Sequence, residues 1–240
     1  MNRVGSLRTP KNHEMRARAR GVVFDRGAPD FDPVNVAGAA PYWRLVAFSE
    51  AQQIYAEGDP ADRLYVVVSG TVKLSRTSFF GPILTIVGPR EMFGALSLFD
   101  PGPRIASATA LSDVSAVAID HDTVRSMIAR HPEVAQQFLQ ILARRLKRTN
   151  DEIADMMLID GMGRVAKRLL QLAHQMSTPE AGALRVAHHL TQVEIAQLAG
   201  VSRETVNQSM SEFTRRGWIT ADRRQSVLIR NAERLARRAR

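Results

Sequence analysis

The side chains best suited to recognise another molecule lie in a short segment, residues 190–213, that carries a polar turn. Arg203 and Glu204 are followed by Asn207 and Gln208 at the spacing of one helical turn. Arginine matches the O6 and N7 atoms of guanine, a carboxylate accepts a hydrogen bond from N4 of cytosine, and side-chain amides match adenine edges. The pattern predicts that these four side chains enter the major groove of DNA from one recognition helix.

Two short helices joined by a tight turn must position those side chains. Thr191 and Glu194 have the spacing of a capping box at the start of the first helix. Gly200 permits a left-handed turn, and Ser202 can cap the second helix. The buried faces of this helix-turn-helix are expected to hold Ile195, Ala196, Leu198, Ala199, Val201, Val206, Met210 and Phe213. The DNA contacts expected from the motif are Thr191, Ser202, Arg203, Glu204, Thr205, Asn207 and Gln208.

A hairpin is predicted after the second helix. Residues 218–220 and 226–229 have the character of two short strands, with Arg223 and Arg224 at the tip between them. Arginines at this place suit contacts to DNA phosphates, which position a protein without specifying sequence. Residues 161–240 also hold fourteen Lys and Arg against six Asp and Glu, which gives +8 of the chain's formal net charge of +9. Together these features predict a winged helix-turn-helix that binds DNA.

Residues 132–159 carry the longest helical pattern of the chain. The seam positions alternate spacings of four and three: Ala135, Leu139, Leu142, Leu146, Thr149, Ile153 and Met156. A strict heptad seam predicts a coiled-coil partner, most simply the same helix of a second copy. The alternative is a helix packed on its own domain, but charged side chains leave only one narrow apolar stripe, which favours the dimer. The two glycines of residues 160–163 indicate a hinge and a domain boundary.

The N-terminal half has a different pattern. Residues 41–130 are expected to form a β-rich, barrel-like domain, because short apolar runs are bounded by frequent glycine and proline. Asp120 has the position of an N-cap for a short helix over about residues 121–129. Residues 1–40 show no sustained hydrophobic period and predict a flexible basic tail. Farther along the chain, residues 177–182 predict a loop.

Composition excludes several classes of protein. The absence of cysteine excludes disulfides, iron–sulfur clusters, thiolate zinc sites and a cysteine nucleophile. No run of about 18 apolar residues is present, and residues 1–20 lack the apolar core of a secretory signal, so we expect a cytoplasmic protein without a membrane partner. No serine–histidine–acid set or paired carboxylate indicates an enzyme. No metal site is expected, because the adjacent His188 and His189 would point apart on a strand.

Residues 190–206 resemble the recognition motif of the CRP/FNR family of bacterial transcription regulators. The resemblance covers about residues 41–240 and also rests on residues 57–59, 63–66, 70 and 93–104. The actinobacterial cyclic-AMP receptor branch is the most similar, because of residues 99–104 and 143–150.

The resemblance implies an α+β fold with a cyclic-nucleotide-binding-type β-roll, a long dimerisation helix and a C-terminal winged helix-turn-helix. The implied parts are a flexible basic tail over residues 1–40, a β-roll sensor domain over 41–130, a dimerisation helix over 131–160 and a DNA-binding domain over 161–240. It also implies a homodimer that binds double-stranded DNA at a palindromic TGTGA-like site, with RNA polymerase as a further partner. No cofactor is required, and cyclic AMP is the candidate effector.

The family's effector site implies contacts from Gly94, Ala95, Leu96, Ser97, Arg104, Ile105, Arg145, Thr149 and Asn150. Ala95 replaces a carboxylate expected near the ribose, and Ile105 replaces a hydroxyl expected beside the arginine that pairs with the cyclic phosphate. Each missing hydrogen bond is worth about 0.5–1.5 kcal/mol, and more where charge is involved. The two changes therefore predict cyclic AMP binding weakened by roughly ten- to a thousandfold.

Several interpretations of the effector site stay open. Its arginines can bind cyclic AMP weakly, bind another anionic effector, lie solvated in an empty pocket, or meet a different carboxylate. The favoured function is a regulator with weakened or altered cyclic-AMP dependence. The alternatives are a fully cyclic-AMP-responsive regulator, an effector-independent DNA-binding protein with a scaffold sensor domain, and a nucleotide-binding module whose main partner is a protein.

Overall fold

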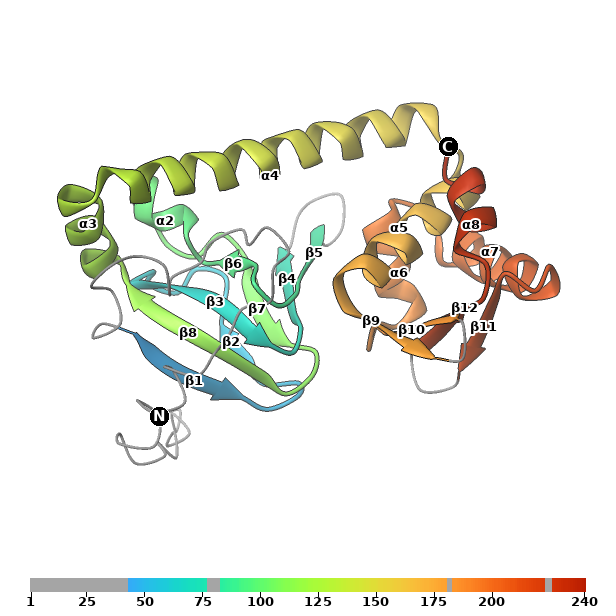
Figure 1. The fold of residues 1–240 in the computed structure, drawn as a ribbon, viewed down its shortest axis with the longest axis horizontal. Helices are drawn as coiled ribbons and strands as arrows, with labels where there is room; N and C mark the ends of the chain where they lie inside the picture. The colour runs from blue at the N-terminus through green and yellow to red at the C-terminus, as the bar shows by residue number, and fades with distance from the viewer. Residues whose placement is uncertain (1–42, 77–82, 181–182, 223–225) are drawn as a thin grey trace.

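The computed structural model describes residues 43–76, 83–180, 183–222 and 226–240. The expected tail, residues 1–40, lies outside the described residues. Figure 1 shows a β-rich domain and a smaller domain of helices and short strands side by side, with one long helix, α4 (Pro132–Leu158), running past both. The predicted α+β architecture is therefore confirmed.

The β-rich domain holds two four-stranded antiparallel sheets with strand orders β1-β8-β3-β6 and β2-β7-β4-β5. Because side chains alternate along a strand, Leu64 and Val66 of β3 pack with the helices, whereas Tyr65 and Val67 pack with the second sheet. The elements are β1 (Arg44–Phe48), β2 (Gln53–Tyr55), β3 (Arg63–Ser69), β4 (Val72–Arg76), β5 (Ile83–Val87), β6 (Met92–Phe93), α2 (Leu96–Phe99), β7 (Ser107–Ala110), β8 (Val114–Asp120) and α3 (His121–Arg130). Asp120 is the N-cap of α3, as predicted, although its side chain makes no capping hydrogen bond.

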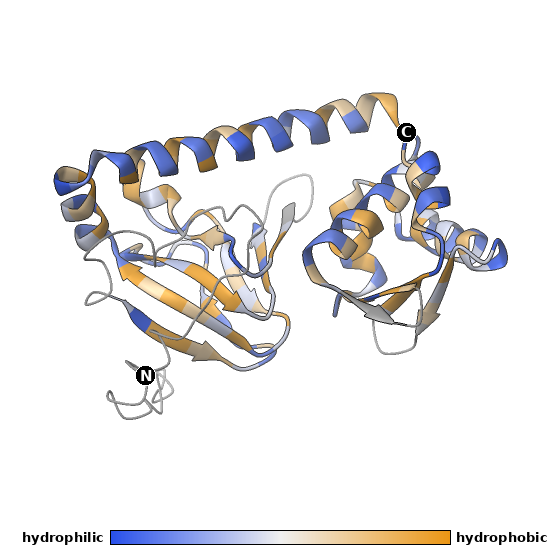
Figure 2. Cartoon of the chain, in the orientation of Figure 1, coloured by the Kyte–Doolittle hydropathy of each residue, from blue (hydrophilic) through white to orange (hydrophobic). Residues whose placement is uncertain are grey.

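Helix α4 has two apolar faces, so the expectation of a single narrow stripe was wrong. Val134, Phe138 and Ile141 are buried against the β-rich domain. The predicted seam lies on another side of the helix, where Leu139 is 65% and Leu146 is 63% exposed. Figure 2 shows that hydrophobic and hydrophilic residues alternate along the whole helix. The long exposed seam is a surface that a second helix can cover.

The C-terminal domain combines helices with a four-stranded antiparallel sheet of order β11-β12-β10-β9. The expected loop was wrong in part, because its first residues form the edge strand β9, where a proline such as Pro179 is tolerated. Helix α8 was not predicted; the side chain of Asn231 caps it by accepting from the amide of Arg234 at 2.9 Å. The elements are α5 (Gly161–Met176), β9 (Ser177–Glu180), β10 (Ala183–Ala187), α6 (Gln192–Ala199), α7 (Arg203–Arg215), β11 (Ile219–Asp222), β12 (Ser226–Ile229) and α8 (Ala232–Arg238).

The two glycines expected to form a hinge lie inside the first turn of α5. Asp160 is the N-cap, and its Oδ1 accepts from the amide of Gly163 at 2.8 Å. A Cβ at Gly163 would lie 2.5 Å from Cγ2 of Ile159, and one at Gly161 would lie 3.0 Å from Cγ2 of Thr205. These glycines allow close packing at the start of α5, and the break between the helices lies at residues 159 and 160, at the edge of the predicted segment. A hinge motion there stays a prediction.

Candidate DNA-binding surface and effector site

The first helix and turn of the helix-turn-helix have the geometry that their sequence predicted. The amide of Thr191 donates to Oε2 of Glu194 at 2.8 Å, and the amide of Glu194 donates to Oγ1 of Thr191 at 3.2 Å, which completes the capping box. Gly200 has φ 61° and ψ 43°, the left-handed conformation that glycine adopts readily. Val201 packs against the core of the C-terminal domain and fixes the turn.

The first turn of α7 carries its polar side chains on the outer side. Ser202 Oγ accepts from the amide of Thr205 at 3.1 Å and starts the helix. Val206 and Phe213 are fully buried and hold the helix from behind. Among the predicted DNA contacts of this helix, the structure exposes the side chains of Arg203, Glu204 and Gln208 to solvent. It leaves Thr205 and Asn207 half-buried.

Glu204 is prepared to act as a hydrogen-bond acceptor. Hydrogen bonds with its own backbone amide and with the side chain of Ser202 lower the pKa of its carboxyl group, so it is ionised at neutral pH. The neighbouring Arg203 carries a guanidinium that keeps its charge. The turn thus offers a donor fork and an acceptor next to each other, which is the complement of guanine and cytosine edges.

The predicted wing is present as the antiparallel pair β11 and β12. Its register pairs Asp222 with Ser226. Arg223 and Arg224 lie outside the described residues, so their phosphate contacts stay a prediction.

Arg164, which the sequence did not indicate, ties the helix-turn-helix to the end of α4. Its Nε donates to the carbonyl oxygen of Ala199 at 3.0 Å, and its Nη2 donates to that of Gly200 at 3.1 Å. Its Nη1 donates to the carbonyl oxygen of Ile159 at 2.7 Å. Local sequence patterns carry no signal for these contacts, because the partners are backbone carbonyl oxygens and two of them lie in a distant segment of the chain.

Polar contacts also join the β-rich domain to the C-terminal domain. Nζ of Lys73 in β4 lies 2.7 Å from Oε1 of Glu194, the carboxylate of the capping box. Burial opposes ionisation of Glu194, but hydrogen bonds from Lys73 and Thr191 outweigh it and lower the pKa of this carboxyl group. Glu91 accepts from Nη1 of Arg148 in α4 and from Nε2 of Gln175 in α5, each at 3.4 Å. The β-rich domain therefore contacts α4 and α5, which lead to the helix-turn-helix, and also α6 within it.

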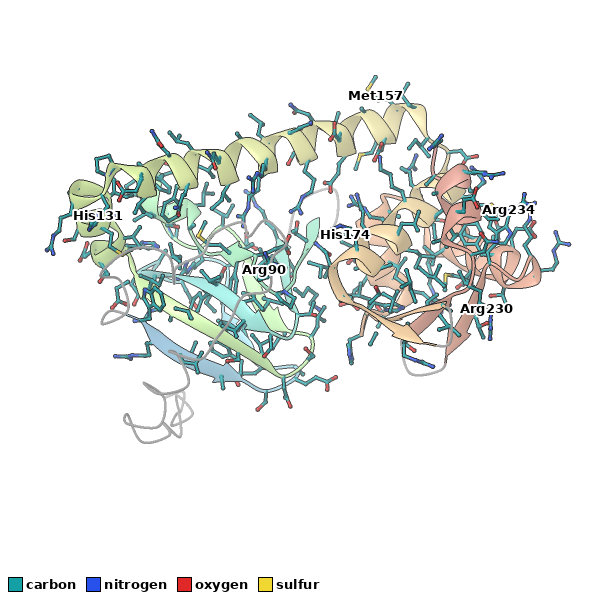
Figure 3. The ribbon with its side chains drawn as sticks, in the orientation of Figure 1. Arg90, His131, Met157, His174, Arg230 and Arg234 are labelled. Carbon is teal, nitrogen blue, oxygen red and sulfur yellow. The ribbon has the colours of Figure 1, made fainter. Side chains whose placement is uncertain are left out.

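A cavity of about 340 Å³ opens beside these contacts, between β5, α4 and α5. Figure 3 shows His174, one of its lining residues, at the boundary between the two domains. The charged groups of the cavity already pair with each other: Arg148 with Glu91 at 3.4 Å and Arg168 with Glu152 at 2.8 Å. The cavity belongs to the domain interface and lies apart from the residues predicted to bind an effector.

The predicted effector site is centred on Arg104, which is only 4% exposed. Its Nη1 donates to the carbonyl oxygen of Gly94 at 2.9 Å, and its Nη2 donates to that of Arg63 at 2.7 Å. Gly94 has a φ of +75°, and a Cβ there would lie 2.7 Å from Nη1 of Arg104, so this position requires glycine. Because the guanidinium is buried and bonded, the interpretation of a solvated arginine in an empty pocket was wrong.

Side chains that the sequence did not indicate surround Arg104. Its guanidinium lies 4.2 Å from the ring centre of Tyr55, whose pKa burial raises to about 12. Oδ1 of Asp62 lies 3.9 Å from Nη2 of Arg104, and a hydrogen bond from Arg63 lowers the pKa of this carboxyl group. His121 is buried next to them, and burial lowers its pKa. Asp62 thus supports the interpretation in which a different carboxylate faces the arginine. These residues come from distant segments, so sequence spacing gave no signal.

We call the predicted effector residues at positions 94–97, 104 and 105 the cassette, and its other members differ in exposure. Ala95 and Ser97 are buried, whereas Leu96 is 46% and Ile105 is 50% exposed. The replacement at position 95 therefore lies in the interior, and the replacement at position 105 lies on the rim.

Of the three predicted effector residues on α4, one reaches the cassette segment in this chain. Arg145 donates through Nη2 to the carbonyl oxygen of Met92 in β6, two residues before Gly94. The hydroxyl group of Thr149 donates to the carbonyl oxygen of Arg145 at 3.1 Å, within its own helix. Thr149 and Asn150 are exposed, and within the described residues neither forms a hydrogen bond to the cassette.

His188 and His189 lie after β10 rather than on a strand, so the expected reason for their divergence was wrong. His188 is buried, and its Nδ1 accepts from the amide of Leu190 at 3.0 Å. Burial lowers the pKa of His188 to about 4. Over the part of the chain that the structure describes, no three side chains of metal-binding type come together.

The chain resembles known proteins over most of its length. Residues 45–131 match the family model of the cyclic nucleotide-binding domain, and residues 163–238 match that of the Crp-like helix-turn-helix domain. Over 211 residues the chain is 53% identical to the CRP-like cAMP-activated global transcriptional regulator of Mycobacterium tuberculosis, which covers 87% of this chain and 94% of that relative. The chain belongs to the CRP/FNR family.

Two further relatives agree with this assignment. The cyclic AMP receptor protein of Thermus thermophilus is 34% identical over 214 residues, 85% of this chain and 96% of the relative. The crystal structure of a CRP/FNR-family transcriptional regulator from the same species has a TM-score of 0.69 at 26% identity and covers 82% of this chain and 98% of its own. The chain is therefore a CRP-like transcription regulator with a helix-turn-helix DNA-binding domain, and not an enzyme. None of the described helices is long and apolar enough to cross a membrane.

Proposed function

We propose that the chain acts as a homodimer that binds a palindromic, TGTGA-like DNA site with weakened or altered dependence on cyclic AMP. The observation that carries the DNA part is the first turn of α7, where Arg203 and Glu204 are exposed and charged. Arg203 would read guanine and Glu204 would accept from cytosine, while Asn207 and Gln208 add amide groups suited to adenine. Thr191, Ser202, Thr205, Arg223 and Arg224 complete the proposed interface.

The seam of α4 supports the proposed dimer. Its apolar side chains are exposed along the helix in the single chain, and Ile153 and Met156 are still 54% and 55% exposed near its end. A second copy of α4 would cover them and place two recognition helices one turn of DNA apart, about 34 Å, which requires a palindromic site. We extend the proposal to RNA polymerase as a partner, because a transcription regulator acts on the transcribing enzyme. We also propose the cytoplasm as the compartment, because bacterial transcription takes place there.

Cyclic AMP is the proposed effector, but with reduced strength. The named relatives are a cAMP-activated regulator and a cyclic AMP receptor protein, and a cyclic nucleotide-binding domain model matches this chain. Against full dependence, Ala95 and Ile105 offer no hydrogen bond where the family pattern has a carboxylate and a hydroxyl group. Arg104 also donates to two backbone carbonyls, and a bound phosphate must compete with or complement these bonds.

Selection of bound DNA from a random pool, with and without cyclic AMP, tests both parts of the proposal. We expect an enriched palindrome with G·C pairs at the positions read by Arg203 and Glu204, and a modest effect of cyclic AMP. Absence of any base preference would contradict the DNA part. Calorimetric titration tests the effector part, and micromolar affinity for cyclic AMP would contradict the weakening.

A second candidate is an effector-independent DNA-binding protein. It is favoured by Arg104, whose buried guanidinium already has backbone partners and a facing carboxylate. This candidate predicts identical DNA selection and affinity at every cyclic AMP concentration, together with no measurable heat of cyclic AMP binding.

A further inference from the structure

Helix α8 has one packed side and one basic side. Leu235 is fully buried, and Ala239 packs against the same core. Arg234 and Arg237 lie on the exposed side, and the exposed Arg230 precedes the helix. Figure 3 places Arg230 and Arg234 on the part of the C-terminal domain that is turned away from the β-rich domain. The C-terminal helix thus presents a cationic outer face, defined here as Arg230, Arg234 and Arg237.

The helix is fixed to the junction between α4 and α5. Nη2 of Arg238 lies 2.8 and 2.6 Å from the two carboxylate oxygens of Asp160. The hydrogen bond from Arg238 lowers the pKa of Asp160, so the pair is charged at neutral pH. A Cβ at Gly163 would lie 2.9 Å from the carbonyl oxygen of Arg238, which shows how closely the two helices approach. The outer face of α8 therefore has a fixed place in the domain.

That place is next to the recognition turn. The same first turn of α5 contacts α7, because a Cβ at Gly161 would lie 3.0 Å from Cγ2 of Thr205. The end of α8 and the start of α7 thus both lie against one short segment, Gly161 to Gly163. The major groove is about 12 Å wide, and DNA carries one phosphate charge per about 1.7 Å of helix axis. If the first turn of α7 enters the major groove, the long arginine side chains of α8 beside it therefore come within reach of DNA phosphates.

The guanidinium groups of the outer face have no strong partners among the described residues, so they can bind an external anion. Within the described residues, the guanidinium of Arg234 has no hydrogen-bond or ion-pair partner. Arg230 donates through Nε to the neutral hydroxyl group of Thr220 at 2.8 Å. Arg237 pairs with Glu233 on the solvent side of the helix, and exposed pairs of this kind are weak. Residues 230–240 hold five arginines against one glutamate, so the segment has a positive surplus.

We propose that the outer face of α8 binds the phosphate backbone of DNA beside the bases read by α7. The proposal rests on the proposed function, in that it requires α7 to enter the major groove. Phosphate contacts add affinity and position the domain, but they carry no base preference. Helix α8 is already packed and ion-paired in the free protein. Binding DNA therefore does not carry the entropic cost of ordering its backbone.

The test is the salt dependence of DNA affinity for the double variant Arg234→Gln/Arg237→Gln. The control is Arg125→Gln/Arg130→Gln, which removes the same charge from exposed side chains of α3. The probe is a duplex that carries the site selected by the wild-type chain. The slope of log K against log salt is expected to become shallower by about 0.9 for each phosphate that the variant no longer neutralises. The control keeps the wild-type slope, and the base preference of the double variant is unchanged.

An α8 variant with the wild-type slope overturns the proposal, and it would leave the basic face for an acidic protein partner. An equal change in the α3 control also overturns it, because the effect would then follow net charge alone. Loss of base preference would show that α8 positions α7 and does not contact phosphate. If the double variant unfolds, Arg234→Gln alone repeats the test, because it breaks no pair within the described residues. Failure of the proposed function can be told apart from failure of the α8 proposal, because the wild-type chain itself would then lack base preference. The salt dependence of binding to a random duplex would still test α8.

Discussion

Replacing Ala95 by glutamate and Ile105 by threonine is expected to strengthen cyclic AMP binding. Ala95 is buried next to Gly94, whose carbonyl oxygen accepts from Arg104. Nε of Arg104 is buried and has no partner within the described residues, so this arginine still has a donor to offer a bound phosphate. Ile105 lies on the rim, where a hydroxyl group can be introduced without loss of a packed side chain.

The size of the gain follows from the two hydrogen bonds. The hydroxyl group is worth about 0.5–1.5 kcal/mol, and the charged glutamate is worth more. The dissociation constant for cyclic AMP should therefore fall by roughly ten- to a thousandfold, which reverses the weakening expected from the two replacements. Threonine at position 105 alone should account for about 2- to 12-fold, and this single variant serves if the buried glutamate prevents folding.

Calorimetric titration of the folded variants measures this change. The matched control is Ala95→Met/Ile105→Val, which has side chains of similar size and no added hydrogen-bonding group. The control is expected to bind cyclic AMP no more tightly than the wild-type chain. If the glutamate–threonine variant folds and gains nothing over the control, the two replacements do not explain the weakened effector site.

Three further results are expected. Arg203→Ala should lose about 1–3 kcal/mol of binding per half-site and discrimination at one base pair; site selection that returns the wild-type preference would show that Arg203 does not read a base. Leu146→Glu places a charge on the seam, where the wild-type side chain is 63% exposed in the single chain, and should raise the dimer dissociation constant at least about tenfold. Sedimentation measures this change, Lys147→Glu is the control beside the seam, and an intact dimer in the Leu146 variant would count against the coiled coil. His188→Asn should remove a loss of stability on acidification. The folded-state pKa of His188 is about 4 and its ordinary value is 6.5, so the unfolded chain binds the proton first as the pH falls. The stability that this group contributes is complete above pH 6.5 and decreases by about 1.4 kcal/mol per pH unit down to pH 4. Denaturant unfolding between pH 4 and 7 measures the slope, and equal slopes for variant and wild type would refute the assignment.

The helix-turn-helix could be predicted from the sequence because its determinants are local. Thr191 and Glu194 are three residues apart, Gly200 supplies the turn, and Ser202 starts the next helix. The environment of Arg104 could not be predicted in the same way. Tyr55 and the other residues around this arginine come from separate strands and loops, and only the packing of the sheets brings them together.

Helix α4 shows a second limit of pattern analysis. Its heptad seam is regular, and it was found by its spacing. Val134, Phe138 and Ile141 form another stripe that covers only the first turns, and a search for one continuous seam passes over it. The glycines at 161 and 163 show a third limit, because a glycine that permits close packing has the same sequence signal as one in a flexible linker.

The contacts of Arg164 have a practical consequence for exchanging DNA specificity between relatives. Ile159 packs against Gly163, Asp160 pairs with Arg238, and Arg164 joins the end of α4 to the turn before α7. A chimera cut at the glycines would combine halves of this packed junction from two different proteins. A crossover upstream, within the solvent-exposed turns of α4, would transplant the junction and the DNA reader as one intact unit.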